Sequence, residues 1–207
     1  WWSHGVRCHP VMTPLQRPLV VSAIVTMALT GCAHMQGRST QDQFMTAIAQ
    51  HCGKAYAGRI VANTPKATTP DPFEGKALIM HVRGCANPTQ RLDIPFHVGD
   101  DHSRTWVVTR TSTGLRLKHD HRHQDGSPDA VTMYGGETAT AGSANRQEFP
   151  VDGESIANFK QNGLSGSVSN TWAMEINGST FVYELARPNG RLFRVAFDLT
   201  QPLAELP

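Results

Sequence analysis

The amino-acid sequence predicts a mostly β protein, folded as an antiparallel barrel or a two-sheet sandwich, with one N-terminal helix. Apolar and polar residues alternate with a period of two in many short stretches beyond Lys76, as in strands that bury one face. Turn-forming Gly, Asn, Pro and Ser separate these stretches. Helical periodicity is confined to a segment near the N-terminus and a short one at 152–163. Strands joined by short turns indicate an antiparallel sheet.

The N-terminal helix is expected within residues 39–53. Thr40 and Gln43 match a capping box, in which each side chain satisfies a free backbone N–H at the other position. Gly53 is a natural C-terminal stop. One stripe of the helix is apolar and should pack onto the sheet; it carries Phe44, Ile48 and Cys52.

About eight strands are expected after a proline-rich loop at 62–75. Proline lacks a backbone donor, so a segment with Pro65, Pro70 and Pro72 should be irregular. Asn177-Gly178 is a strong hairpin signal between two of the strands. The expected strands are 76–85, 91–99, 104–111, 114–123, 130–136, 171–176, 180–186 and 191–200.

Alternation also predicts which side chains of the last two strands face the core. The core set is Phe181, Tyr183, Leu185, Phe193, Val195, Phe197 and Leu199. A sheet of this size usually closes or folds on itself. The strand pattern resembles that of the calycins, which implies an up-and-down barrel with a helix at one end. A two-sheet sandwich is the alternative.

The start of the chain has the layout of a secretory signal. Residues 1–11 precede the first methionine, Met12, and are expected to be an untranslated extension. A short region with Arg17 then leads into an apolar run at 19–29. This run is shorter than the ~20 residues that a membrane-spanning helix needs. The expected signal peptide is therefore 12–31.

Four residues close this segment and resemble the lipobox of bacterial lipoproteins: Leu29-Thr30-Gly31-Cys32. The resemblance implies cleavage before Cys32, diacylation of its sulfur and anchoring to a membrane of the bacterial envelope by that lipid. Ala33 follows, as in lipoproteins of the outer membrane that face the periplasm. A lipidated tether at 32–38 and a single β-rich domain at 39–207 would complete the protein. The alternative is an ordinary cleaved signal.

Charge and cysteine content limit the classes of function that the protein can have. The chain has 19 basic and 17 acidic residues, and loss of Arg7 and Arg17 with the signal would leave a neutral protein. No run of Lys or Arg suggests a nucleic-acid partner. Cys52 and Cys85 would be the unmodified pair in an oxidising compartment, so a disulfide is expected. Its loop of about 33 residues corresponds to roughly 3–4 kcal/mol of stabilisation.

The expected strand 114–123 ends in a histidine-rich segment. Leu115, Leu117, His119, His121 and His123 share one face, so the histidines continue the core face towards its rim. Alternate histidines on a strand can converge on one ion, and neutral imidazole suits Zn or Cu. A third ligand would come from another segment: His97, His81, Asp125 or Asp129. The competing interpretations are a structural strand end followed by an ordinary turn, and an acid–base site.

Signals of catalysis are weak. No G-x-S-x-G, H-E-x-x-H, P-loop or G-x-G-x-x-G motif occurs. Gly135-Gly136 predicts a β-bulge, or a close approach of the backbone to a ligand. No acid–base spacing marks the scattered carboxylates Asp93, Glu137, Glu148, Asp152, Glu154, Glu175 and Glu184.

The leading hypothesis is a monomeric, non-enzymatic periplasmic binding or envelope-interaction module without a cofactor. Its site would be the barrel mouth or an exposed strand edge, and its partner a small ligand or an envelope protein. The second hypothesis is a Zn- or Cu-binding protein that uses His119, His121 and His123. The third is an enzyme of unrecognised type.

Overall fold

A computed structural model describes residues 38–66 and 68–207 of the chain. The extension at 1–11, the signal peptide at 12–31 and lipidated Cys32 all lie outside the described residues. The same holds for all of the tether at 32–38 except Arg38.

The domain that begins after the tether consists of two α-helices, one short 3-10 helix (η1) and ten strands within the described residues. In chain order these are α1 (Thr40–Ala49), β1 (Ala55–Thr64), β2 (Leu78–His81), β3 (Arg91–Val98), β4 (Asp101–Arg110), β5 (Leu115–His121), β6 (Tyr134–Glu137), β7 (Arg146–Pro150), α2 (Gly153–Gln161), η1 (Ser165–Ser167), β8 (Thr171–Ile176), β9 (Thr180–Ala186) and β10 (Leu192–Pro202).

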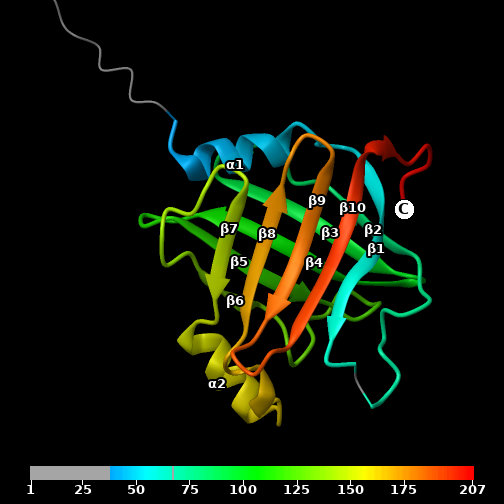
Figure 1. The fold of residues 1–207 in the computed structure, drawn as a ribbon, viewed down its shortest axis with the longest axis vertical. Helices are drawn as coiled ribbons and strands as arrows, with labels where there is room; N and C mark the ends of the chain where they lie inside the picture. Colours follow the sequence, from blue (N-terminus) through cyan, green and yellow to red (C-terminus); the bar gives the residue numbers. More distant parts are fainter. Residues whose placement is uncertain (1–37, 67) are drawn as a thin grey trace, which may run out of the picture. The chain divides into compact units, whose positions relative to one another are not determined.

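All ten strands form one antiparallel sheet, in the order β6-β5-β4-β3-β2-β1-β10-β9-β8-β7. The sheet curls into a nearly closed barrel, with β7 to β10 on one wall and β3 to β5 on the other (Figure 1). Helix α1 lies across one end of the barrel, and α2 lies at the opposite end (Figure 1). The predicted mostly β, barrel-like fold is confirmed, and the two-sheet sandwich is not formed.

Backbone contacts at Gly135 and Gly136 hold the two edge strands of the barrel, β6 and β7, close to each other. The carbonyl of Gly135 accepts a hydrogen bond from Asp152 N at 2.9 Å. The hydroxyl of Ser155 accepts from Gly135 N at 2.8 Å and donates to Gly135 O at 3.1 Å. A Cβ on Gly136 would lie 1.7 Å from Pro150 O. The paired glycines therefore let the chain beyond β7 approach β6.

The predicted bulge at Gly135-Gly136 is wrong, because β5 and β6 pair in an unbroken register from Arg116–Glu137 to His119–Tyr134. The alternative was a close approach of the backbone to a ligand, and a close approach of the backbone does occur at these glycines. It is made to the protein's own chain at Pro150, so it does not require a ligand.

The barrel interior contains the side chains that alternation placed there. Phe193, Val195, Phe197 and Leu199 are all buried, as are Phe181 and Tyr183. Leu185 is half-buried and packs against the core. Trp106 lies among them, with its ring centroid 4.4 Å from that of Tyr183 and 4.7 Å from that of Phe96. Aromatic stacking of this kind adds to the stabilisation from burial alone.

Helix α1 closes its end of the barrel with the buried residues Phe44, Met45 and Ile48. The capping box is formed by Ser39 and Asp42, one residue before the predicted pair Thr40 and Gln43. The predicted cap is wrong because the helix begins at Thr40, one residue earlier than that pair requires. The hydroxyl of Thr40 donates instead to Ala141 O at 2.7 Å.

Two of the ten strands, β1 and β7, were not predicted from the sequence. Strand β1 has small and half-buried residues, and its end overlaps the loop expected at 62–75. It nevertheless lies between β2 and β10, because both neighbours supply backbone partners. Strand β7 has five residues and pairs only with β8. The sulfurs of Cys52 and Cys85, the predicted disulfide pair, are bonded at 2.03 Å.

Candidate functional site: a pocket at the barrel end opposite α1

A pocket of about 300 Å³ opens at the end of the barrel where β5, β9 and β10 meet α2. Most of its lining is apolar or aromatic, as in small-molecule sites. The lining residues are Phe73, His121, Asp129, Val131, Tyr134, Phe159, Leu164, Ser167, Asn170, Trp172, Tyr183, Leu185, Arg187 and Phe193. A hollow of about 500 Å³ beside β1 is larger, but it lies on the outer surface and is lined by Arg59, Lys66, Glu74 and Lys76 among others.

Aromatic rings form one wall of this barrel-end pocket. The ring of Tyr134 lies 5.2 Å from that of Phe159 and 5.8 Å from that of Trp172, centroid to centroid. His119 stacks behind Tyr134 at 4.7 Å, with its ring only 10° from parallel. Rings that hold each other in this way give a wall that exists before any ligand arrives.

His119 is buried behind the wall and is held in one tautomer. Its Nδ1 lies 3.1 Å from the carbonyl oxygen of Tyr134, which can only accept, so Nδ1 carries the proton. Its Nε2 lies 2.8 Å from Tyr183 Oη and accepts from that hydroxyl. Burial lowers the pKa of His119 to about 3, so the ring is neutral at physiological pH.

The next two histidines of the strand have different environments. His121 lines the pocket, and its Nε2 lies 3.0 Å from Tyr134 Oη. Burial lowers the pKa of His121, and Asp129 opposes that shift. His123 is exposed, and its backbone N–H donates to Ser127 O. The three imidazoles therefore lie in the core, in the pocket wall and in solvent.

The expected third metal ligands do not join these histidines. His81 and His97 each lie between core-facing neighbours on their strands, so their side chains are on the outer face. Asp125 Oδ1 accepts from Ser127 N, and Asp129 Oδ1 from Val131 N, as in ordinary turns. Across residues 38–66 and 68–207, no group of three His, Cys, Asp or Glu side chains could hold a metal ion.

A polar group that the sequence did not single out lies at the rim of the pocket. Arg187 Nε donates to Asn170 Oδ1 at 2.6 Å, and Arg187 Nη2 donates to Ser167 Oγ at 3.3 Å. Arg187 directly follows β9, Ser167 is the last residue of η1, and Asn170 directly precedes β8. Only the tertiary structure brings these three residues together. The period of two along β9 nevertheless places Arg187 on the same face as the core residues of that strand.

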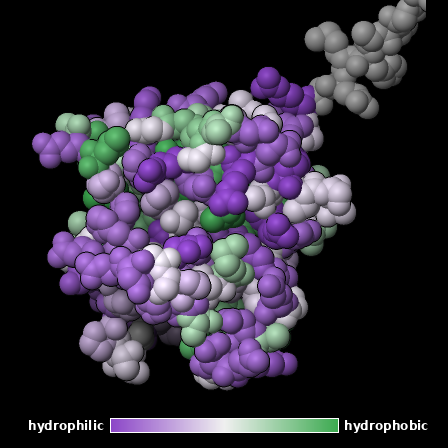
Figure 2. Space-filling view, turned by 180° about the vertical axis from the view of Figure 1, so that it is seen from behind, coloured by the Kyte–Doolittle hydropathy of each residue, from purple (hydrophilic) through white to green (hydrophobic). Residues whose placement is uncertain are grey.

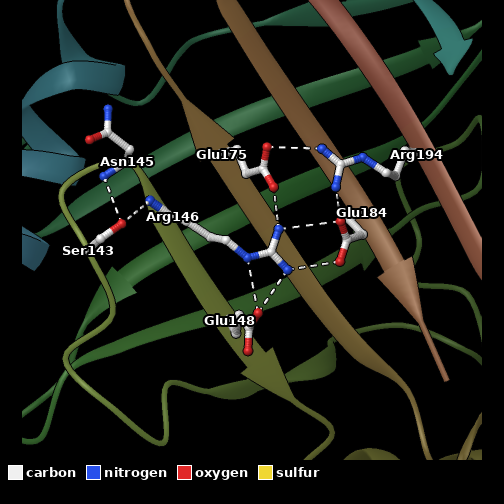
Figure 3. Close-up of polar contacts among 7 residues, drawn as sticks. All are labelled: Ser143, Asn145, Arg146, Glu148, Glu175, Glu184 and Arg194. Carbon is white, nitrogen blue, oxygen red and sulfur yellow. Dashed lines mark hydrogen bonds and ion pairs between the residues drawn. The ribbon is translucent and has the colours of Figure 1, made fainter. Parts of the chain in front are cut away.

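A second polar cluster lies on the outer face of β7 to β10 (Figure 3). Arg146 Nη2 lies 2.9 Å from Glu184 Oε1 and 2.8 Å from Glu148 Oε1. Arg194 Nη2 lies 2.9 Å from Glu175 Oε2. Further ion pairs join Arg146 to Glu175 and Arg194 to Glu184. Glu148, Glu175 and Glu184, whose spacing in the sequence indicated no acid–base pair, therefore share two arginines.

This outer ion-pair network has the properties of a structural element. Burial raises the pKa of Glu175, but hydrogen bonds from Arg194 and Arg146 outweigh this effect, so the net pKa is lowered. The hydrogen bonds that Arg146 donates to Glu184 raise the pKa of Arg146 above its ordinary value. Groups held in their charged forms are unsuited to exchange protons near neutral pH.

One outer face of the barrel is mainly polar (Figure 2). The side of the barrel formed by β3 to β5 carries mainly hydrophilic side chains, with apolar ones in small scattered groups (Figure 2). No helix within the described residues has the length and apolar character required to cross a membrane.

Comparisons with protein-family models, with curated proteins and with solved structures gave no match. The fold and the pocket thus define an antiparallel β-barrel with a preformed, ligand-sized cavity at one end.

Proposed function

We propose that the protein is a membrane-anchored periplasmic lipoprotein that binds a small, largely apolar ligand without catalysing a reaction. The observation that carries this proposal is the pocket of about 300 Å³ at the barrel end. Its volume is at the lower limit of the range typical of small-molecule sites, about 300–1,000 Å³. A barrel that served only as an interaction surface would need no cavity of this kind.

The lining of the pocket supports binding by apolar contact. Tyr134, Phe159 and Trp172 present ring surfaces, while polar groups such as His121 and Asn170 are few. Removal of apolar ligand surface from water contributes about 25 cal/mol for each Å². Because the rings and His119 already pack against one another, little ordering is required when the ligand binds.

The sequence supports the proposed anchoring of the protein to a membrane of the bacterial envelope. The resemblance of Leu29-Thr30-Gly31-Cys32 to a lipobox supports a lipid anchor on Cys32. We expect a monomer tethered to the outer membrane and facing the periplasm. The anchor is tested by mass spectrometry of the mature N-terminal peptide. A diacylglyceryl group on Cys32, absent in Cys32→Ser, is the expected result, and an unmodified N-terminus elsewhere would contradict it.

The binding proposal is tested by native mass spectrometry and elemental analysis of protein purified from its own host. We expect an organic ligand of low mass that dissociates on denaturation. Leu185→Trp should displace it, because residue 185 is half-buried and lines the pocket. Leu206→Trp is the matched control, since Leu206 is 57% exposed and lies elsewhere. A ligand-free protein after mild purification, or a bound metal alone, would contradict the proposal.

A further inference from the structure

The rim of the barrel-end pocket presents a cation that has no anionic partner among the described residues. Arg187 lines the pocket, and no described carboxylate lies within ion-pair distance of it. We propose that the ligand is an amphipathic anion, whose carboxylate or sulfonate group binds Arg187 while its apolar part lies against the aromatic wall. This inference rests on the proposed function and deepens it by naming the class of ligand.

The hydrogen bonds of Arg187 leave part of its guanidinium free. Nε donates to the side chain of Asn170 and Nη2 to Ser167, and both partners are neutral. Nη1 has no hydrogen-bond partner within the described part of the chain. Guanidinium groups favour oxyanions with two accessible oxygens, because two N–H donors can bind both oxygens at once. Arg187 therefore has a donor and a full positive charge available for a ligand.

The position of Arg187 is set before the ligand arrives. Asn170, which fixes Nε, is buried, its N–H donates to Ser167 O, and its carbonyl accepts from Val151 N. An arginine held by such partners loses less side-chain entropy on binding than a free one. The contrast is with Arg146 and Arg194, which are likewise held but are already paired with carboxylates.

Electrostatics favour an anion at this end of the pocket and orient it. Burial lowers the pKa of Arg187, and the nearby charge of Arg191 lowers it further, so the local potential is positive. Asp129 also lines the pocket, but it lies beside His121, where it opposes the lowering of the His121 pKa by burial. An anion is repelled there and attracted at Arg187. The apolar part of the ligand is then directed towards Tyr134 and Trp172.

Two fluorescent probes with one skeleton separate charge recognition from apolar binding. 8-Anilinonaphthalene-1-sulfonate carries a sulfonate, and N-phenyl-1-naphthylamine has the same rings without it. We expect the wild type to bind the sulfonate more tightly. Arg187→Gln should weaken sulfonate binding about ten- to hundredfold, the range for hydrogen bonds to charged groups. Its affinity for the neutral probe should change less than about twofold, because the apolar wall is unaltered.

Arg191→Gln is the matched control for net charge, because Arg191 lies four residues from Arg187 and does not line the pocket. It should retain most of the preference for the sulfonate, because Arg191 adds to the positive potential but does not bind the anion. Arg187→Lys, which keeps the charge but loses the planar fork, should retain part of it. Thermal unfolding of each variant identifies any that fails to fold, and Arg187→Lys then replaces Arg187→Gln in the comparison.

The outcomes distinguish this inference from the proposed function. Equal binding of both probes by the wild type, or a preference that survives in Arg187→Gln, would overturn the anionic ligand and leave the pocket as a binding site. Failure of the wild type to bind either probe would overturn both. Sulfonate binding that persists in Leu185→Trp would place the anion outside the pocket and would also overturn the inference.

Discussion

His119 Nε2 accepts a hydrogen bond from Tyr183 Oη at 2.8 Å, and this contact joins the barrel core to the wall of the pocket. The same imidazole donates from Nδ1 to the carbonyl of Tyr134. One neutral tautomer therefore fixes a residue of β9 and a residue of β6, both of which line the pocket. A protonated ring would have two donors and could not accept from Tyr183.

Acid should destabilise the protein through this histidine. Burial lowers the pKa of His119 to about 3, whereas an unfolded chain protonates histidine near pH 6.5. Between these values the unfolded state binds more protons, so stability falls as the pH falls, by up to about 1.4 kcal/mol per pH unit. Urea unfolding between pH 7 and pH 4 measures this slope.

The comparison that isolates His119 is with His119→Gln. Burial also lowers the pKa of His97, to about 4, and the pKa values of His51, His81 and His121. These groups give slopes of the same sign in both proteins. The variant should show a shallower loss of stability with acid, whatever its stability at pH 7. Parallel slopes in the two proteins would refute the assignment.

The ion-pair network should contribute to stability mainly through Glu184. Its side chain is only 9% exposed and bonds both Arg146 and Arg194. Glu184→Gln should cost about 1–3 kcal/mol in the free energy of unfolding, because two partly buried cations lose a charged partner. Glu148→Gln is the control: Glu148 is 57% exposed, and such pairs contribute about 0–1 kcal/mol. Equal costs in chemical denaturation would contradict this ranking.

Gly136 should be needed for closure of the barrel. A Cβ at this position would lie 1.7 Å from Pro150 O, a backbone atom that cannot turn away like a flexible side chain. Gly136→Ala should therefore cost at least about 2–3 kcal/mol and increase hydrogen exchange in β6 and β7. Gly153→Ala meets nothing within 4 Å and should be nearly neutral. An unchanged melting temperature for Gly136→Ala would show that the edges need not approach.

The disulfide should stabilise the region that joins α1 to the sheet. Cys52 and Cys85 are separated by 33 residues, a loop whose closure corresponds to about 3–4 kcal/mol. Paired substitution of both cysteines by serine should lower the free energy of unfolding by about that amount. Thiol labelling of the denatured, unreduced wild type provides the control, since neither residue should react. Labelling of both would contradict the bond.

The strands that could be predicted were those with a clear period of two and a good turn at each end. Asn177-Gly178 lies between β8 and β9, and the core residues of β9 and β10 followed from alternation. Strand β1 was missed because its Ala and Gly residues hide the period, and β7 because it has only five residues. Both are specified chiefly by their neighbours.

The sequence by itself determined the mostly β fold, the core faces of the strands and the pairing of Cys52 with Cys85. These follow from local alternation, turn chemistry and the small number of cysteines. Tertiary structure alone decided how the three histidines differ, because burial decreases over the four residues from His119 to His123. His119 is buried and neutral behind the pocket wall, and His123, beyond the end of β5, is in solvent. Tertiary structure also brought Arg187 to the rim of an apolar pocket, since the segments that form this site are far apart in the sequence.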